Sequence, residues 1–218
     1  MLIHIINDFL FPPKCVLCKN VLKKNETDYC NHCRIHAPEY TKAKSSISFL
    51  AGWTTVWYYS GDVRKSILRY KFGNKRSYAD AYGRSLAMKI LEDLPDDIDC
   101  ITWAPVSKLR KLRRGYDQVE LFANVIAGEL KVPLKQLLKK VRHTPAQSSL
   151  DSESKRRANV MGAYQVTDKQ IVEGKRILLL DDVFTTGATA SECAKTLLFA
   201  GAKDVFFASL AVTPHNKK

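Results

Sequence analysis

The stretch ILLLDDVFTTGATA, residues 177–190, holds residue types that could bind a sugar phosphate. Its run of aliphatic residues predicts a strand buried on both faces, as in a parallel sheet. Asp181 and Asp182 follow, and adjacent carboxylates are costly without hydroxyl, cation or amide partners. The next turn offers hydroxyls and backbone N–H groups at the start of a predicted helix, which suits a phosphate monoester. A ribose 5-phosphate would suit both the acidic pair, through its hydroxyls, and the turn, through its phosphate. The alternative is a tight turn whose acids point into solvent.

Four cysteines form two Cys-x-x-Cys pairs near the start of the chain, and they are Cys15, Cys18, Cys30 and Cys33. Two such pairs let four thiolates converge on one zinc ion in tetrahedral geometry, and redox chemistry is the alternative. The surrounding segment has few aliphatic residues, so we expect the metal to supply much of its folding energy. We therefore predict an N-terminal unit, residues 1–44, that consists of a short amphipathic helix and a four-cysteine zinc ribbon.

The formal net charge of +13 indicates a polyanionic partner, such as nucleic acid or a phosphorylated ligand. A merely basic surface is the alternative. No apolar run reaches the roughly 18–20 residues that a membrane span needs. The opening stretch MLIHIINDFLFPPK carries Asp8 and lacks the small-residue cleavage site of a signal peptide. We therefore expect a cytoplasmic protein whose cysteines stay reduced.

Strands and helices alternate along the rest of the chain, residues 45–218. Strands are expected at residues 52–60, 96–103, 133–143, 175–183 and 203–212, and helices at residues 77–94, 118–130 and 188–200. This alternation predicts an α/β domain with a doubly wound parallel sheet. In such sheets ligands bind beyond the carboxyl ends of the strands, where the two acids would lie. The polar stretch at residues 144–166 has the length and composition of a mobile lid.

The stretch that ends in DDVFTTGAT closely resembles the phosphoribosyl-pyrophosphate signature of the type I phosphoribosyltransferases. The resemblance implies that Asp181 and Asp182 contact the ribose hydroxyls, directly or through Mg²⁺. The residues that would bind the 5-phosphate are Thr185, Thr186, Gly187, Ala188 and Thr189. Such enzymes place a pyrophosphate-binding loop after an earlier strand, and the corresponding residues here are Pro105, Val106, Ser107 and Lys108.

A four-cysteine ribbon before such a domain resembles the ComF family, bacterial competence proteins linked to DNA uptake. YSGDVRKSILRYKFGNKR is similar to its basic segment, and APVSKLRKLRRGYDQVELFA to its long basic loop and following helix. HTPAQSSLDSESKRRANVMGAY is similar to its Thr-Pro-x-Gln loop. Three residues depart from the family pattern: Trp103 stands where members often have proline, Ser107 where many have histidine, and Asp117 where asparagine is common.

Basic residues concentrate in residues 64–76, 108–114 and 139–157. If these segments line one face, they would bind single-stranded DNA with little sequence preference, whereas plain solvation is the alternative for each charge. The residues predicted to bind DNA are Arg69, Lys71, Arg110, Lys111, Arg113, Arg114, Tyr116, Arg142, Arg156 and Arg157. Among them Tyr116 would stack on a base if its ring is exposed.

Two hypotheses of different classes follow. The first is a ComF-like competence protein that binds single-stranded DNA and works with other DNA-uptake proteins. It would also bind phosphoribosyl pyrophosphate together with Mg²⁺. The second is an active phosphoribosyltransferase, which joins a nitrogen nucleophile to the anomeric carbon and releases pyrophosphate. Such chemistry needs little beyond charge stabilisation of the leaving diphosphate and of an oxocarbenium-like ribose, so the sequence is compatible with both. A regulator that senses the ligand without converting it is a third hypothesis.

Overall fold

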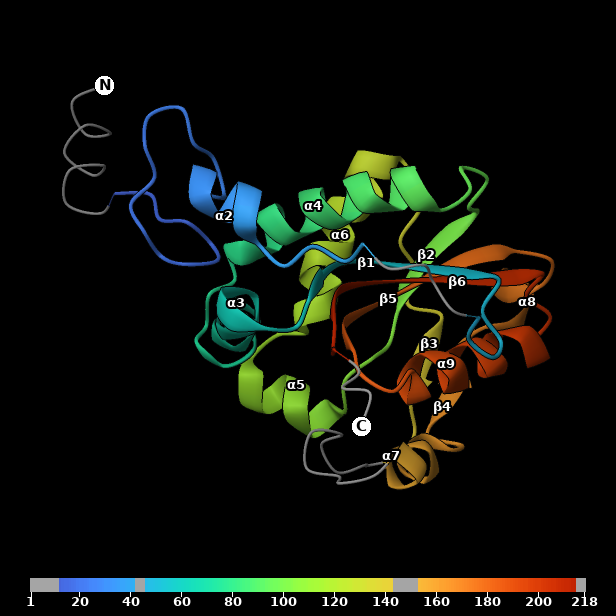
Figure 1. The fold of residues 1–218 in the computed structure, drawn as a ribbon. Helices are drawn as coiled ribbons and strands as arrows, with labels where there is room; N and C mark the ends of the chain where they lie inside the picture. Colours follow the sequence, from blue (N-terminus) through green and yellow to red (C-terminus); the bar gives the residue numbers. More distant parts are fainter. Residues whose placement is uncertain (1–11, 42–45, 143–152, 215–218) are drawn as a thin grey trace.

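The computed structural model of the protein describes residues 12–41, 46–142 and 153–214 (Figure 1). Its elements, in chain order, are α2 (Asn31–His36), β1 (Gly52–Tyr58), α3 (Gly61–Phe72), α4 (Tyr78–Asp93), β2 (Cys100–Trp103), α5 (Lys108–Arg114), α6 (Gln118–Leu130), β3 (Leu138–Lys140), α7 (Glu153–Val160), β4 (Tyr164–Val166), α8 (Lys169–Val172), β5 (Arg176–Phe184), α9 (Ala188–Phe199) and β6 (Asp204–Val212). None of the helices in these ranges is long and apolar enough to cross a membrane. The predicted N-terminal helix and the predicted domain boundary between residues 44 and 45 lie outside the described residues.

Four parallel strands form the central sheet in the order β1-β6-β5-β2. β5 pairs with both β6 and β2, so that Leu180 lies beside Ala208 on one side and Trp103 on the other. β5 and β6 are buried along most of their length, which is why their sequences are nearly continuous apolar runs. The strand predictions for these two segments are confirmed.

Successive residues of β5 point to opposite faces of the sheet and enter two separate cores. Leu178 and Leu180 pack in a core with residues of α4 and α6, whereas Ile177 and Leu179 pack in a core with residues of α9. Figure 1 shows α4 and α6 on one side of the sheet and α9 on the other. Because helices cover both faces, the predicted doubly wound α/β fold is confirmed.

The four-cysteine segment shares the first of these cores with α3 and α4. Val16 and Leu17 of this segment are buried. The hydroxyl of Ser66 on α3 donates to the backbone oxygen of Val16 at 2.5 Å. The guanidinium of Arg69, one turn later, donates to the backbone oxygens of Val16 and Leu17. The segment is therefore joined to the α/β domain by buried contacts rather than by a linker alone.

The basic segment after β2, which resembles a long loop in the sequence, forms a helix. α5 follows Ser107 and is capped by Gly115, whose φ of +77° lies in the left-handed region that favours glycine. Its two leucines, Leu109 and Leu112, are both exposed. Because α5 buries no apolar stripe, hydrophobic periodicity could not reveal it.

The polar stretch predicted as a lid is partly regular structure. It contains α7 and β4, and β4 pairs antiparallel with β3 in a separate two-stranded sheet. Residues 144–152 of the predicted lid lie outside the described residues. The strand predicted within residues 133–143 is confirmed as β3, which lies in this small sheet and not in the central one.

Helices α4 and α6 approach each other closely at Gly83. A Cβ atom added there would lie 2.5 Å from Cβ and 2.6 Å from Cγ1 of Val125. We predict that Gly83→Ala destabilises the fold by about 1–3 kcal/mol through overpacking. Each kcal/mol corresponds to a loss of about 2–4 °C in melting temperature for a chain of this size.

Gly128, on α6, supplies the matched control because a Cβ added there meets no atom within 4 Å. Gly128→Ala should leave the melting temperature unchanged or raise it, since alanine is favoured over glycine in a helix by about 0.5–1 kcal/mol. Thermal denaturation followed by circular dichroism measures both variants. Equal melting temperatures for the two would contradict the close packing of α4 on α6.

Candidate functional site

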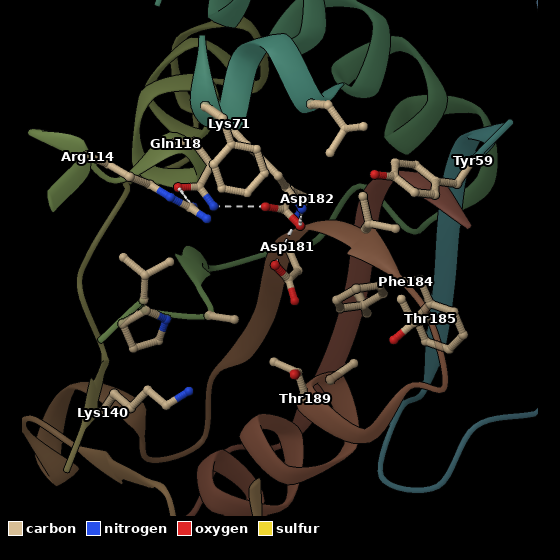
Figure 2. A pocket seen from close by; sticks show the side chains of 18 of the residues that line it. Tyr59, Lys71, Arg114, Gln118, Lys140, Asp181, Asp182, Phe184, Thr185 and Thr189 are labelled. Atoms are coloured by element: carbon tan, nitrogen blue, oxygen red, sulfur yellow. Dashed lines mark hydrogen bonds and ion pairs between the residues drawn. The ribbon is translucent and has the colours of Figure 1, made fainter. Parts of the chain in front are cut away.

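The carboxyl edge of the sheet, where its parallel strands end, borders a pocket of about 850 Å³ (Figure 2). Adjacent strands β2 and β5 run parallel, so the loop after Trp103 and the acids near the end of β5 meet there. Lys71 and Phe72 of α3, Lys140 of β3 and Thr189 of α9 also line the pocket. The fold thus brings together side chains that are far apart in the sequence.

The loop between β5 and α9 presents polar groups to this pocket. Gly187 has a φ of +75°, and a Cβ there would lie 2.8 Å from Cζ of Phe184, so only glycine fits. α9 begins at Ala188, and the first N–H groups of a helix have no intrahelical partner. The buried Oγ1 of Thr186 has no hydrogen-bond partner among the described residues. Thr185 and Gly187 of this loop line the pocket, together with Thr189 in the first turn of α9. This arrangement could hold an anion.

Asp182 is buried and has two partners from different helices. Its Oδ1 accepts from Nζ of Lys71 at 2.7 Å, and its Oδ2 accepts from Nε2 of Gln118 at 2.8 Å (Figure 2). Burial alone would raise the pKa of Asp182, but the charge of Lys71 and the two hydrogen bonds together lower this pKa below its ordinary value. Asp182 is therefore ionised at neutral pH.

Asp181 lies beside this ion pair and lines the same pocket. Its Oδ1 accepts the backbone N–H of Asp182 at 2.8 Å. Burial, together with the negative charge of Asp182, raises the pKa of Asp181 to about 8. The two acids thus differ in protonation: near neutral pH Asp182 is charged and balanced by Lys71, whereas Asp181 holds a proton for much of the time.

The predicted pyrophosphate loop follows β2 at the same edge. Pro105 and Val106 line the pocket. Ser107 is buried, and its Oγ has no hydrogen-bond partner in the described ranges. An unpaired buried hydroxyl is costly, so this loop has capacity for a polar ligand. The side chain of Lys108 lies outside the described part of the chain.

Two residues that depart from the family pattern contact each other beneath this loop. Nε1 of Trp103 donates to Oδ2 of Asp117 at 3.3 Å. The N–H of Val106 lies 3.5 Å from the same oxygen, and the N–H of Val119 donates to the other oxygen at 3.0 Å. Burial raises the pKa of Asp117, and the N–H donors oppose this rise. Asp117 therefore both caps α6 and connects it to the predicted pyrophosphate loop.

Two cations predicted to bind DNA have buried partners instead. Arg69 donates to the backbone of the four-cysteine segment, and Lys71 pairs with Asp182. The prediction that these two side chains lie on a DNA-binding face is wrong. The sequence shows the charges of α3 but not that one turn of the helix faces the cysteine segment while the next faces the pocket.

Three further cations predicted to bind DNA already have hydrogen-bond or ion-pair partners within the protein. Lys111 forms an ion pair with Glu120 at 2.8 Å on the surface. Arg142 donates to backbone oxygens near the end of α7, including that of Met161 at 2.7 Å. Arg114 donates to Oε1 of Gln118 at 2.8 Å and lines the pocket. Side chains outside the described part of the chain are those of Arg110, Arg113, Arg156 and Arg157.

Tyr116 does not present its ring for stacking. It is 7% exposed, its hydroxyl donates to the backbone oxygen of Tyr70 at 2.6 Å, and the guanidinium of Arg76 lies 4.6 Å from its ring centroid. The prediction that Tyr116 stacks on a base is therefore wrong, because its ring is buried beside Tyr70 of α3 and beneath the guanidinium of Arg76.

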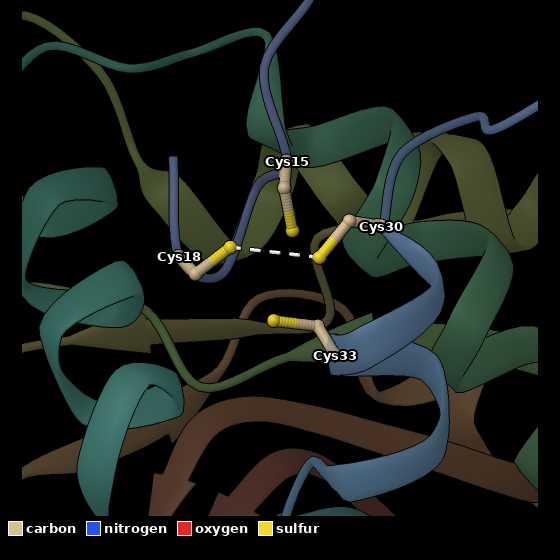
Figure 3. Close-up of side chains that lie close together, drawn as sticks. All are labelled: Cys15, Cys18, Cys30 and Cys33. Carbon is tan, nitrogen blue, oxygen red and sulfur yellow. Dashed lines mark hydrogen bonds between the residues drawn. The ribbon is translucent and has the colours of Figure 1, made fainter. Parts of the chain in front are cut away.

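The four cysteines converge as predicted (Figure 3). Their Sγ atoms all lie within 4.8 Å of one another, and those of Cys18 and Cys30 are 3.6 Å apart. Four thiolates at about 2.3 Å from one zinc ion would be about 3.8 Å apart, so the cluster has the dimensions of a tetrahedral metal site. The four residues could therefore hold a metal ion.

Several residues of the pocket carry no signal in the sequence. Gln118 begins an ordinary amphipathic helix, and Lys140 lies in a short strand of a separate sheet. Tyr59 and Phe184 line the pocket and are typical core residues by composition. Only the fold identifies them.

The sheet, its acidic pair and its glycine-containing loop define a type I phosphoribosyltransferase fold. Residues 120–218 match the family model described as "Phosphoribosyl transferase domain". A solved structure of glutamine phosphoribosylpyrophosphate amidotransferase from Bacillus subtilis, complexed with ADP and GMP, is similar with a TM-score of 0.44 and 22% identity, over 65% of this chain and 30% of that chain.

Curated relatives match this chain over most of its length. Competence protein F from Haemophilus influenzae is 27% identical over 203 residues, which are 87% of each chain. Competence protein ComFC from Bacillus subtilis is 26% identical over 206 residues, which are 88% of this chain and 82% of the relative. The chain belongs to the ComF family.

The two acids should respond to substitution in opposite directions. Asp182→Asn leaves Lys71 without its anion, and breaking a buried ion pair costs about 3–5 kcal/mol, so the melting temperature should fall by at least roughly 6 °C. Asp181→Asn keeps an oxygen that can accept the N–H of Asp182 and removes a carboxylate that is costly to bury. Its melting temperature should therefore rise.

The gain from Asp181→Asn should be larger at pH 8 than at pH 5. The unfolded carboxyl loses its proton near pH 4, whereas the folded one keeps it until about pH 8. The folded wild type therefore loses stability as the pH rises through this window, and the amide does not. Thermal denaturation of both variants without ligand, each compared with the wild type at the same pH, measures these effects. Equal destabilisation by the two substitutions at both pH values would contradict the assigned roles.

Proposed function

We propose that the pocket binds phosphoribosyl pyrophosphate and that the protein acts in DNA uptake. The observation that supports this best is that one pocket is bordered by the acidic pair, by residues 185–189 and by the loop that begins at Pro105. The ribose hydroxyls would lie on Asp181 and Asp182, and the 5-phosphate at the start of α9. The diphosphate would lie towards the loop after β2.

Mg²⁺ would accompany the diphosphate, because this ion is usually held by one or two carboxylates together with phosphate oxygens and water. Asp182 is already paired with Lys71. Asp181 has no salt bridge within the described ranges and faces the pocket, so it fits contact with a ribose hydroxyl, or with the metal once it has released its proton. When bound, the metal would neutralise charge on the diphosphate.

Single-stranded DNA would bind to the basic surface around the pocket. Two of the three basic segments each contribute a cation to the lining, namely Arg114 and Lys140, whereas Lys71 is paired with Asp182. The formal net charge of +13 favours a polyanionic partner. Two relatives are named as competence proteins, which supports a role in natural transformation together with other DNA-uptake proteins. We retain the prediction that the protein is cytoplasmic.

An active phosphoribosyltransferase is the second candidate. Beyond the acidic pair the lining of the pocket becomes apolar, with Tyr59, Leu68 and Phe184. A planar acceptor would find contact area there next to the ribose. Catalysis would then consist of orientation by the pocket and charge stabilisation of the departing diphosphate.

Calorimetric titration with phosphoribosyl pyrophosphate, with and without Mg²⁺, tests the proposed ligand. Asp181→Asn should weaken Mg²⁺-dependent binding about 10–100-fold, since a hydrogen bond to a charged group contributes about 1.5–3 kcal/mol. Asp80→Asn, on the exposed side of α4, is the matched control and should bind as the wild type does. Wild-type protein that does not bind the ligand would contradict the proposal, and release of pyrophosphate with one added base would favour the enzyme.

We propose that Cys15, Cys18, Cys30 and Cys33 hold one structural zinc ion per chain, since four thiolates leave no position open for substrate. Protein purified without chelators should contain one zinc per chain by mass spectrometry of the metal. Cys15→Ser should lose this zinc, whereas Cys100→Ala, in β2, should retain it. A metal-free wild type, or full zinc content in Cys15→Ser, would contradict the assignment.

A further inference from the structure

Phe72 is a large aromatic residue that the fold leaves in solvent beside the pocket. It is the last residue of α3, and 68% of it is exposed, although the rest of α3 buries its apolar side chains Val63, Ile67 and Tyr70. Exposed phenylalanines also occur elsewhere on the surface, and Phe72 differs from them because it lines the pocket.

Arg114 lies against the ring of Phe72. Its guanidinium carbon is 4.8 Å from the ring centroid, within the range of a cation–π contact. The same guanidinium donates from Nη1 to Oε1 of Gln118, whose amide holds Asp182. Arg114 is thus positioned by the pocket, and its charge is placed next to an exposed aromatic face.

The surroundings of the ring are basic. Lys75 and Arg76 follow in the exposed turn after α3, and Phe72, Asn74 and Arg114 all line the pocket. An aromatic ring flanked by cations is what single-strand binding proteins use, because every base has a face that can stack and every nucleotide carries a phosphate. The cations favour this partner over an apolar protein surface.

We propose that Phe72, together with Arg114, forms a platform on which an unpaired base of single-stranded DNA stacks. The inference rests on the proposed function and replaces Tyr116, which is buried, as the stacking residue. The strand would pass the mouth of the pocket between the end of α3 and α5. Bases held in a duplex are not available to this platform.

The chain contains a matched control for Phe72. Phe199 is the last residue of α9, is 75% exposed, and has Nζ of Lys195 at 5.5 Å from its ring centroid. It is not among the residues that line the pocket. It lies about 17 Å along α9 from the start of that helix, where the 5-phosphate would bind. The two phenylalanines therefore share exposure and a neighbouring cation but differ in location.

Fluorescence anisotropy with a labelled poly-thymidine strand, and with an abasic strand of equal length, tests the platform. Phe72→Ala should weaken binding of the thymidine strand about 5–150-fold, the range expected for one stacked base, without changing the slope of affinity against salt. Phe72→Trp should retain binding, and Phe199→Ala should match the wild type. On the abasic strand, the wild type and Phe72→Ala should bind equally.

The outcomes separate this inference from the proposed function. Wild-type protein that binds the thymidine strand as tightly as Phe72→Ala does would overturn the platform while leaving DNA binding intact. Equal loss on the thymidine and abasic strands would show that the ring contacts no base, and would also overturn it, in favour of an apolar protein contact at this site. Failure of the wild type to bind either strand at low salt would overturn both the platform and the DNA-binding function.

Discussion

The ion pair between Lys71 and Asp182 connects the main parts of this molecule. Two adjacent carboxylates at the end of a buried strand cannot both be charged without a nearby cation. Lys71 supplies it from α3, and Gln118 adds an amide from α6, so that Asp182 is ionised and Asp181 remains directed to the pocket. Side chains on two helices, α3 and α6, thereby offset the free-energy cost of burying the acids.

The four-cysteine segment contacts the same helix, α3, that carries Lys71. On α3, Ser66 and Arg69 face the backbone of Val16 and Leu17, and Lys71 lies just beyond them at the pocket. A metal ion that fixes the cysteine segment would therefore also fix the helix that supplies Lys71. In this arrangement the segment would support the pocket from a distance, although none of its described residues lines the pocket.

Local patterns in the sequence predict the framework of the fold well. The apolar runs of β5 and β6, the acidic pair, the Thr-Gly turn and the spacing of the cysteines each depend on neighbouring residues, and each is found where expected. Side-chain partners depend on tertiary contacts. Lys71 and Asp182 are 111 positions apart, and nothing near either residue indicates the other. The same holds for Tyr116, for which stacking on a base required an exposed ring: the ring is buried beside Tyr70, and nothing near Tyr116 in the sequence indicates this.

A crystal structure of the protein grown with phosphoribosyl pyrophosphate and Mg²⁺ tests the assignment of the pocket most directly. We predict density for the 5-phosphate on residues 185–189, for the ribose hydroxyls at Asp181 and Asp182, and for the diphosphate near the loop that begins at Pro105. Ligand density outside this pocket, or an empty pocket at saturating ligand, would contradict the assignment.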